Sequence, residues 1–488
     1  MGGNYFYSQL TEAKDGNLIP LCKNSVTGQE IALHSKYNPL REAEGFAAQI
    51  DESCLFFVIL GIAGGYHIEK ILEKNEKCRI LAVEDSESSL AFLMKLPLVK
   101  KLSKQKRIYF TDIYHLKEML LTHYKPAIHG NLTILPLRQW ESVFSQEACQ
   151  CKEAITQAIK LLAADFSVQS HFGKIWQKNI ISNLSLAEKA KSFDEVCKKT
   201  DKMKTAAIIA AGPSLDNNIA LLKKKRDSYY IIATDTAYSA LTKQNIISDA
   251  VVSIDGQQVS HEHYMENLSQ KTIFFFDLCA NAASVRRAFS ITKNIILTES
   301  GHPLAQYASL YTGKRTFPHL EAGSGTVTIA AASLAKKIGF KNIEFFGADF
   351  SYSGGRAYCK GTYLESQFCI KSNRLETAEK ASTALIYRTP VIKKDDGKIT
   401  TEILEAYRLS LSDYMNKKEV SENTDICKFN LNDFKSRYCN DLRSTFKSEN
   451  EYDENTYAFT TLLPLCAKLG KDSCFLAYLK TLRYTERV

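Results

Sequence analysis

Several patterns that mark secreted, membrane-spanning and zinc-binding proteins are absent from this sequence. No apolar run approaches the roughly 20 residues needed to cross a bilayer, and the first residues lack the apolar core of a signal peptide. The 13 cysteines are odd in number and contain no C-x-x-C pair, so neither a disulfide framework nor a zinc finger is indicated. We therefore expect a cytoplasmic protein with free thiols, no metal site and no association with membranes.

A strong charge bias and a disorder-prone composition are also absent. The 488 residues include 63 basic and 54 acidic ones, which leaves a formal net charge of +9. Over this length the bias is mild: it suits an anionic small molecule, and it is too weak to predict nucleic acid as a partner. With 45% hydrophobic and 24% charged residues, the composition is that of a globular protein, and the length predicts several domains.

Early in the chain, the pattern is that of strand, glycine turn, helix and strand. Leu55–Leu60 and Arg79–Val83 are apolar runs that predict buried strands, and Tyr66–Lys74 predicts a helix between them. Gly61–Gly65 forms the turn, and Glu84 closes the second strand. A Rossmann-type unit places an acidic residue on ribose about 20 residues after its glycines, but here the glycine pattern is incomplete. Either the unit binds a cofactor, or the glycines only allow helix and strand to pack closely.

The segments on either side of this unit have weaker patterns. Residues 1–40 are polar and predict irregular structure. Residues 145–200 predict mainly helix, in which five side chains share one face: Phe172, Ile175, Trp176, Asn179 and Asn183. Asparagines on an apolar stripe are usually hydrogen-bonded in a core or at a domain junction, and we expect this of Asn179 and Asn183.

The centre of the chain alternates strands with helices, and the end is helical. Alternation predicts a mainly parallel sheet covered by helices on both faces. The overall prediction is an α/β protein with a Rossmann-like N-terminal domain (1–165), a central Rossmann-like domain that holds the ligand (166–385) and a helical C-terminal domain (386–488). The strands expected in the centre are Ala206–Ala210, Tyr229–Ala233, Ala250–Ile254, Thr272–Phe276, Ile295–Thr298 and Ile343–Phe346.

The first central strand leads into Gly212, Pro213 and Ser214. Glycine allows a tight turn and a close backbone approach, and proline is preset for the start of a helix. The Ser214 hydroxyl and the first N–H groups of that helix are suited to phosphate, which the helix dipole also favours. The alternative is a simple helix cap.

The next two strands also end in polar residues. Thr234 and Asp235 follow the second strand, and Asp255 follows the third. Ligands of open α/β sheets lie at the carboxyl ends of strands, so these side chains are candidates for contacts with a sugar hydroxyl or a base. Helix capping explains any one of them singly and explains the whole group less well.

A second glycine-rich turn precedes a helix near residue 327. Gly323, Ser324 and Gly325 lie between Glu321 and that helix, which makes a second candidate anion site. No Gly-Lys-Ser/Thr follows, so a P-loop kinase is disfavoured.

The last central strand ends at Asp349 and continues into a loop with two tyrosines. Tyr352 and Tyr358 lie six residues apart, with Arg356 between them. Two phenols and a guanidinium are suited to stabilising charge on a departing phosphate. The alternative is a glycine-rich surface turn with packed aromatic rings.

The Gly212–Ser214 motif together with the run from Gly323 to Tyr358 resembles the bacterial sialyltransferases that use CMP-sialic acid. Over most of its length the chain resembles the motility accessory factor (Maf) glycosyltransferases of flagellin, whose central domain is similar to 6-hydroxymethylpterin diphosphokinase-like proteins. The Gly61–Glu84 unit and the Phe172–Asn183 helix add to the likeness.

This resemblance implies a transferase that moves a nonulosonic acid, of the pseudaminic or legionaminic type, from its CMP form to serine or threonine of flagellin. It requires no cofactor beyond the CMP-activated sugar. It implies that Tyr352 and Tyr358 hold the leaving phosphate, and that the CMP site includes Gly212, Ser214, Asp235, Gly323 and Ser324.

One departure concerns the general base. The sialyltransferase relatives have a histidine after the second tyrosine, whereas this chain has no histidine after His319. The candidates for the base that remain are His319, Glu321, Asp349 and Glu365.

Two other functions stay open on the sequence. One is a pterin-type diphosphokinase with ATP and magnesium, for which Asp235, Asp255 and Asp349 are the available carboxylates. The other is an accessory protein that binds flagellin without catalysis, although the intact glycines, serines and tyrosines argue against a decayed site.

Overall fold

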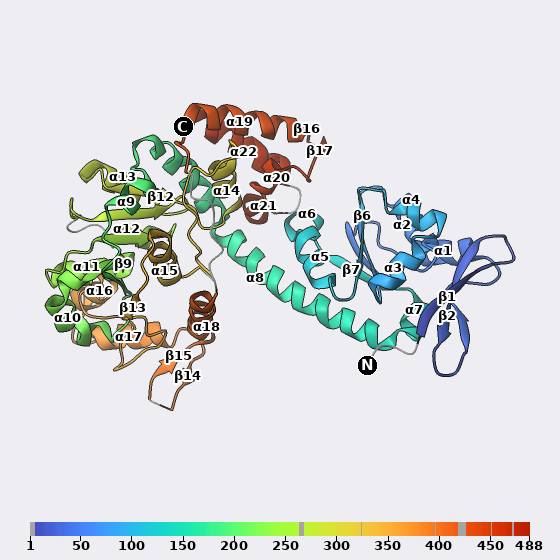
Figure 1. Ribbon diagram of the computed structural model, residues 1–488, viewed down its shortest axis with the longest axis horizontal. Coiled ribbons are helices and arrows are strands. Elements are labelled where there is room, and N and C mark those ends of the chain that lie inside the picture. The colour runs from blue at the N-terminus through green and yellow to red at the C-terminus, as the bar shows by residue number, and fades with distance from the viewer. Residues whose placement is uncertain are drawn as a thin grey trace. The chain divides into compact units, whose positions relative to one another are not determined.

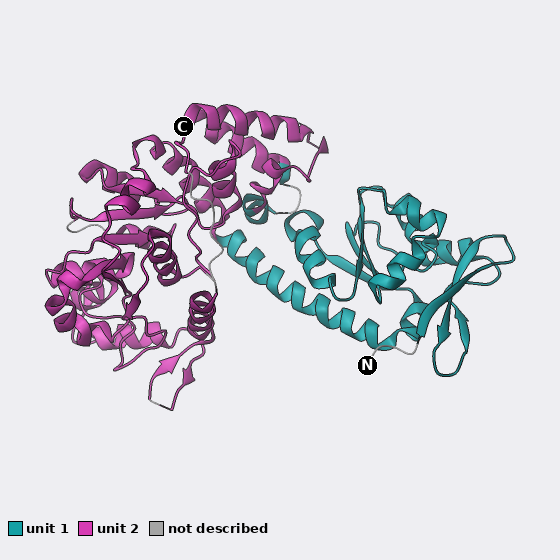
Figure 2. Cartoon of the chain, in the orientation of Figure 1, with its two compact units in different colours: residues 1–171, 464–474 teal, residues 172–463, 475–488 magenta. Residues whose placement is uncertain are grey.

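The computed structural model divides the chain into two compact units (Figure 2). Unit 1 comprises Met1–His171 and Pro464–Cys474, and unit 2 comprises Phe172–Leu463 and Phe475–Val488. The structure describes residues 5–262, 268–323, 325–395, 397–417, 426–449, 451–470 and 473–488.

Unit 1 contains a four-stranded parallel sheet in the order β6-β5-β4-β7. Figure 1 labels its two edge strands, β6 and β7. The strands are β4 (Phe56–Leu60), β5 (Arg79–Glu84), β6 (Ile108–Asp112) and β7 (Leu132–Pro136). The predicted β4, helix α2 (Tyr66–Lys74) and β5 are confirmed. Further helices in this unit are α1 (Pro39–Ala48), α3 (Glu87–Leu93), α4 (Pro97–Leu102), α5 (Leu116–His123), α6 (Pro126–His129) and α7 (Arg138–Val143).

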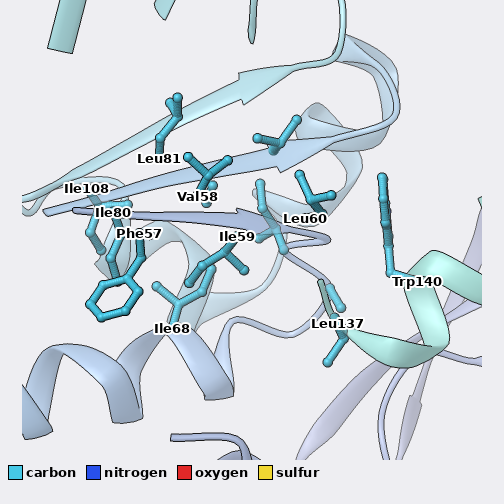
Figure 3. Packing of buried hydrophobic residues seen from close by; sticks show 14 of the residues in the cluster. Phe57, Val58, Ile59, Leu60, Ile68, Ile80, Leu81, Ile108, Leu137 and Trp140 are labelled. Carbon is cyan, nitrogen blue, oxygen red and sulfur yellow. The ribbon is translucent and has the colours of Figure 1, made fainter. Parts of the chain in front are cut away.

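The core of unit 1 explains why its first strand is a continuous apolar run. Every residue of β4 is buried, because a parallel sheet covered on both faces has no solvated side. Figure 3 shows Val58, Ile59 and Leu60 of this strand together with Ile68 of α2 and Leu81 of β5.

Residues 1–40 were predicted to be irregular, and this prediction was wrong. They contain an antiparallel sheet of β1 (Tyr5–Glu12), β2 (Leu18–Asn24) and β3 (Glu30–Ala32). Gly16, with φ of 84°, lies in the turn between the first two strands. In β1 only Tyr7 is buried, so the strand has few apolar residues facing a core, and its sequence gives no continuous hydrophobic signal.

The long helix α8 (Ser145–Leu184) has 40 residues and belongs to unit 1 as far as His171. The prediction of mainly helical structure here is confirmed, and η1 (Ala187–Lys189) and α9 (Phe193–Lys199) follow it.

Unit 2 is built on a six-stranded sheet in the order β12-β11-β10-β9-β8-β13, and every neighbouring pair is parallel. Each strand lies within one residue of its predicted bounds, so the predicted α/β class is confirmed. The strands are β8 (Thr205–Ile209), β9 (Tyr229–Thr234), β10 (Ala250–Ser253), β11 (Ile273–Asp277), β12 (Ile295–Thr298) and β13 (Ile343–Phe346).

Helices connect these strands, and their order in the sheet creates a crevice. The chain runs outward from β8 to β12 and then returns to place β13 on the other side of β8. The loops after β8 and β13 therefore meet at a topological switch point, which is the usual ligand position in open α/β sheets. The connecting elements are α10 (Leu215–Lys224), η2 (Arg226–Ser228), α11 (Asp235–Lys243), α12 (Gln258–Glu262), α13 (Ala282–Ile291), α14 (Pro303–Leu310) and α15 (Val327–Ile338).

The chain after β13 is mainly helical, as predicted, with two short hairpins. Among the described residues, no helix combines the length and apolarity that a membrane span requires. The elements are α16 (Tyr363–Lys371), α17 (Ala378–Ile386), β14 (Ile392–Lys393), β15 (Ile399–Thr400), α18 (Glu402–Asn416), α19 (Leu431–Thr445), β16 (Phe446–Ser448), β17 (Glu451–Tyr452), α20 (Tyr457–Thr460), α21 (Leu463–Leu469) and α22 (Cys474–Arg487).

Candidate functional site

The loops after β8 and β13 pack backbone against backbone. The Gly212 N–H donates to the Gly347 carbonyl at 2.8 Å. A Cβ atom on Gly212 would lie 2.5 Å from that carbonyl oxygen and 2.6 Å from Oδ2 of Asp349. Gly347 has a φ of 66°, and a Cβ there would lie 2.2 Å from the Ala210 carbonyl oxygen. Only glycine fits at both positions, because the neighbouring atoms belong to backbone.

Ser214 and Asp349, which were predicted for different roles, bind each other. The Ser214 N–H donates to Oδ2 of Asp349 at 2.8 Å, and the Ser214 hydroxyl donates to Oδ1. The carboxylate therefore occupies the position at the start of α10 where a phosphate was expected. Because helix starts attract negative charge, Asp349 is an internal anion that a phosphate at Ser214 would have to displace.

A second link joins the tyrosine loop to the start of α10. Arg356 Nη1 lies 2.5 Å from Oδ2 of Asp216, and the Lys360 N–H donates to Oδ1 of the same carboxylate at 3.0 Å. Asp216 lies in the first turn of α10, where an acidic residue is a signal for a helix start, but nothing in the sequence links it to Arg356.

The two tyrosines lie in different surroundings. The backbone of Tyr352 pairs with Ile399 of β15, with N–O distances of 2.6 and 3.1 Å. Burial raises the pKa of Tyr358, nearby Tyr352 and Asp235 raise it further, and Arg388 lowers it. Tyr358 therefore lies within electrostatic range of both Tyr352 and the end of β9. Arg388, exposed beyond α17, was not predicted from the sequence.

Asp235 and Asp255 bind groups of the protein itself. Thr234 occupies the cap position of α11, where its side chain makes no capping hydrogen bond. Asp235 is 2% exposed and accepts from the Thr236 N–H and from the Ser253 hydroxyl, each at 2.8 Å. Asp255 accepts from the Gln257 N–H at 2.9 Å. Asp235 thus already has protein donors on both oxygens.

The second predicted anion site lies at the start of α15. Gly323 donates to Oε1 of Glu321 at 3.2 Å. Its φ of 54° would strain any other residue, and a Cβ there would lie 2.6 Å from the Ser410 hydroxyl. Gly325 has a φ of 89°. Thr326 caps the helix, and its hydroxyl accepts from the Thr328 N–H. Ser324 lies outside the described residues.

Of the candidate bases, His319 is held by a buried carboxylate. Its Nδ1 lies 3.0 Å from Oε1 of Glu299, which also pairs with Arg315 at 2.5 Å. The hydrogen bond to Glu299 raises the pKa of His319. Its other ring nitrogen, Nε2, lies 4.0 Å from Glu321. By contrast, Glu365 lies in the first turn of α16 and accepts from the Gly361 N–H at 3.1 Å, just before that helix.

The candidates therefore form two groups along one edge of the sheet. His319 forms a bridge with Glu299 just beyond β12, while Ser214 and Asp349 lie beyond β8 and β13. Strands are spaced about 4.8 Å apart, and β12 is four places from β8. The groups are thus separated by about 19 Å, with the ends of β9, β10 and β11 between them.

Comparison with known proteins identifies the central region. Residues 178–355 match a family model described as 6-hydroxymethylpterin diphosphokinase MptE-like. The chain carries an MptE-like domain. This agrees with the resemblance inferred from the sequence. The matched range runs from the last turns of α8 past Tyr352 and ends before Arg356 and Tyr358.

Relatives from Treponema pallidum (strain Nichols) are described only as uncharacterized proteins. One is 37% identical over 143 residues, which are 29% of this chain and 67% of the relative. The chain belongs to the same family as that treponemal protein. Two others are 38% identical over 149 residues (30% of this chain, 52% of the relative) and 27% identical over 211 residues (42% and 36%). The chain therefore spans only about half or less of those two relatives.

Structural similarity to a known protein extends beyond the MptE-like domain and covers almost the whole chain. A Maf glycosyltransferase from Magnetospirillum magneticum AMB-1 superposes with a TM-score of 0.51 over 99% of this chain and 89% of the other, at 13% identity. The shared fold agrees with the predicted likeness to the Maf architecture.

The asparagines at the start of the MptE-like domain are hydrogen-bonded in its core, as predicted. Asn179 Nδ2 donates to the carbonyls of Gly256 and Cys279, both at 3.1 Å. Asn183 Nδ2 donates to the carbonyls of Leu278 and Ala280 at 3.0 and 2.9 Å. The two side chains thus fix the loops that follow β10 and β11.

Outside the MptE-like domain, the Gly61–Glu84 unit favours the packing interpretation. Glu84 is fully buried and accepts from the Ile62 N–H at 3.0 Å and from the Trp140 indole. A Cβ on Gly61 would lie 2.5 Å from Cβ of Trp140, whose ring stands beyond Leu60 at the end of β4 (Figure 3). Trp140 therefore takes up the acceptor oxygen of Glu84 and the space that a ribose would need. Burial and Asp85 raise the pKa of Glu84.

Metal ligands are not gathered in the parts of the chain that the structure describes. No group of three or more His, Cys, Asp or Glu side chains there is placed to hold an ion.

Proposed function

We propose that the protein is a glycosyltransferase that moves a nonulosonic acid of the pseudaminic or legionaminic type from CMP to serine or threonine of flagellin in the bacterial cytoplasm, for flagellum assembly and motility. The observation that carries the proposal is the contact between the loops after β8 and β13 at the switch point, which is where a ligand crevice is expected. There Ser214 binds Asp349, and the second loop continues to Tyr352 and Tyr358, in a chain that has the Maf fold.

The reaction divides into two tasks. The bond between the anomeric carbon and the CMP phosphate breaks, and the two tyrosines and Arg356 are suited to stabilising the negative charge on the departing phosphate. The acceptor hydroxyl forms the new bond to the anomeric carbon and gives its proton to a base. The donor needs no further cofactor, because CMP is itself the leaving group.

The test is a complete reaction with CMP-activated nonulosonic acid and flagellin. We expect CMP release to match a flagellin mass increase of one sugar residue, located on serine or threonine. CMP release without sugar on flagellin would contradict the acceptor, and no release from any CMP-nonulosonate would contradict the donor.

The second candidate function is a pterin-type diphosphokinase, which the MptE-like match favours. Magnesium and ATP would need carboxylates at the crevice. Asp235 and Asp349 are both there, but each already accepts hydrogen bonds from protein on both oxygens. This arrangement favours the glycosyltransferase over the kinase. Transfer of diphosphate from ATP to 6-hydroxymethylpterin would reverse that preference, and no turnover of either substrate would favour a non-catalytic flagellin-binding protein.

The position of His319 decides whether it can be the base. It lies about 19 Å from the Ser214 loop by strand count, whereas a base must be within hydrogen-bond reach of the proton that it takes. For a reaction beside Tyr352 and Tyr358 we therefore expect His319→Asn to keep kcat within about tenfold of wild type. A loss of about 10²–10⁴-fold in kcat, in a variant that still melts cooperatively, would place the reaction beyond β12 instead.

A further inference from the structure

A cavity of about 280 Å³ lies at the carboxyl edge of the sheet in unit 2, away from the switch point. The last part of α8, the loop after β10 and the start of α13 form its walls. β10 and β11 are two and three places from β8, so the cavity lies about 10–14 Å along the edge from the Ser214 loop. It shares no lining residue with the crevice.

The lining of this cavity is positively charged. Lys178 and Arg286 both line it, and none of its lining residues is acidic. Arg286 Nη1 donates to the Ser182 hydroxyl at 2.9 Å, which fixes one end of the guanidinium. The start of α13 adds the positive end of a helix dipole to the same wall.

The walls are held by buried side chains rather than by mobile loops. Asn179 is 7% exposed, lines the cavity and donates to the carbonyls of Gly256 and Cys279. Asn281 accepts from the Ala283 and Ser284 N–H groups at 3.0 and 3.1 Å. A Cβ on Gly256 would lie 2.8 Å from the Cys279 carbonyl oxygen. The cavity is therefore preformed, which reduces the cost of ordering a ligand.

We propose that this cavity, defined by Lys178, Asn179, Ser182, Gly256, Asn281 and Arg286, is a second anion-binding site that takes one phosphate or carboxylate group of a small ligand. Two cations that line one cavity, of which Arg286 is held by Ser182, favour such a group over a neutral one. The volume suits a small ligand group rather than a whole nucleotide. The site does not depend on the proposed function, because its residues are separate from those of the crevice.

The experiment uses Trp176 as the reporter, because its Cδ1 lies 3.1 Å from the Cβ position of Gly256. The other tryptophan, Trp140, is fully buried in unit 1. The full chain is titrated with inorganic phosphate and, separately, with free N-acetylneuraminic acid. The two titrations distinguish a phosphate from a sugar carboxylate as the source of the anion.

We expect saturable binding that weakens at least about tenfold in Lys178→Ala and in Arg286→Ala and is unchanged in Lys174→Ala. Lys174 is an exposed lysine one turn earlier on α8 that does not line the cavity. Melting temperatures check that each variant is folded. Equal affinities in the wild type and both cavity variants, or no saturable binding of either anion, would overturn the proposal. Because CMP binding is measured in the same samples, loss of CMP binding with intact anion binding would contradict only the proposed function.

Discussion

Replacing Gly212 with alanine lowers the rate of sugar transfer at least about 100-fold. The new methyl group would lie 2.5 Å from the Gly347 carbonyl oxygen and 2.6 Å from Oδ2 of Asp349, so the two loops at the switch point have to separate. Displacements of about 1 Å at a reacting centre commonly cost two orders of magnitude in rate. The measurement is kcat/KM for CMP-nonulosonate, together with CMP affinity.

Gly45→Ala is the matched control. Gly45 lies in α1 with no atom within 4 Å of its Cβ position, and alanine there should leave activity unchanged and stabilise the helix by about 0.5–1 kcal/mol. If Gly212→Ala retains wild-type transfer while folding normally, the donor does not bind between these two loops.

Replacing Trp140 with alanine destabilises unit 1 by about 3–5 kcal/mol. The indole is fully buried, and its loss leaves both a cavity and a buried Glu84 carboxylate without its Trp140 donor. Denaturant unfolding followed by circular dichroism measures the effect. We expect CMP affinity, measured at low denaturant, to stay within about twofold of wild type, because the crevice belongs entirely to unit 2.

Trp140→Phe is the control for volume, since it keeps most of the packing and removes only the hydrogen bond. It should cost less than half as much as the alanine variant. If Trp140→Ala instead creates specific nucleotide binding in unit 1, or costs less than about 1 kcal/mol, then the Gly61–Glu84 unit is a ligand site that Trp140 merely covers.

The sequence predicted the six strands of the unit 2 sheet and, in unit 1, β4 and β5, because these are short and largely apolar runs. It did not predict β6 and β7, whose residues include Thr111, Asp112 and Thr133. Leu55–Leu60 and Ile295–Thr298 could be predicted from their own residues alone, because a strand that is buried on both faces is apolar along nearly its whole length. The β1–β3 sheet was missed because it is antiparallel and partly exposed. In β1, for example, Phe6 is 49% exposed while Tyr7 is buried.

The positions of the site residues were predictable, but their partners were not. Gly212, Ser214 and Asp349 all follow strands, and the sequence therefore placed them at one edge of the sheet. The hydrogen bond from the Ser214 N–H to the Asp349 carboxylate joins residues that are 135 positions apart. Arg356 and Asp216 are separated by 140 positions. Such pairs are fixed by the return of the chain to β13, which local patterns do not encode.

The central claim is tested most directly by equilibrium binding of CMP, compared with ATP plus magnesium, to the wild type, to Ser214→Ala and to Ser290→Ala. Ser290 lies at the far end of α13, where its hydroxyl donates to the Arg287 carbonyl, and serves as the control. We predict that CMP binds the wild type and Ser290→Ala equally, binds Ser214→Ala at least about tenfold more weakly, and binds without magnesium. Magnesium-dependent binding of ATP in the absence of CMP binding would contradict the account.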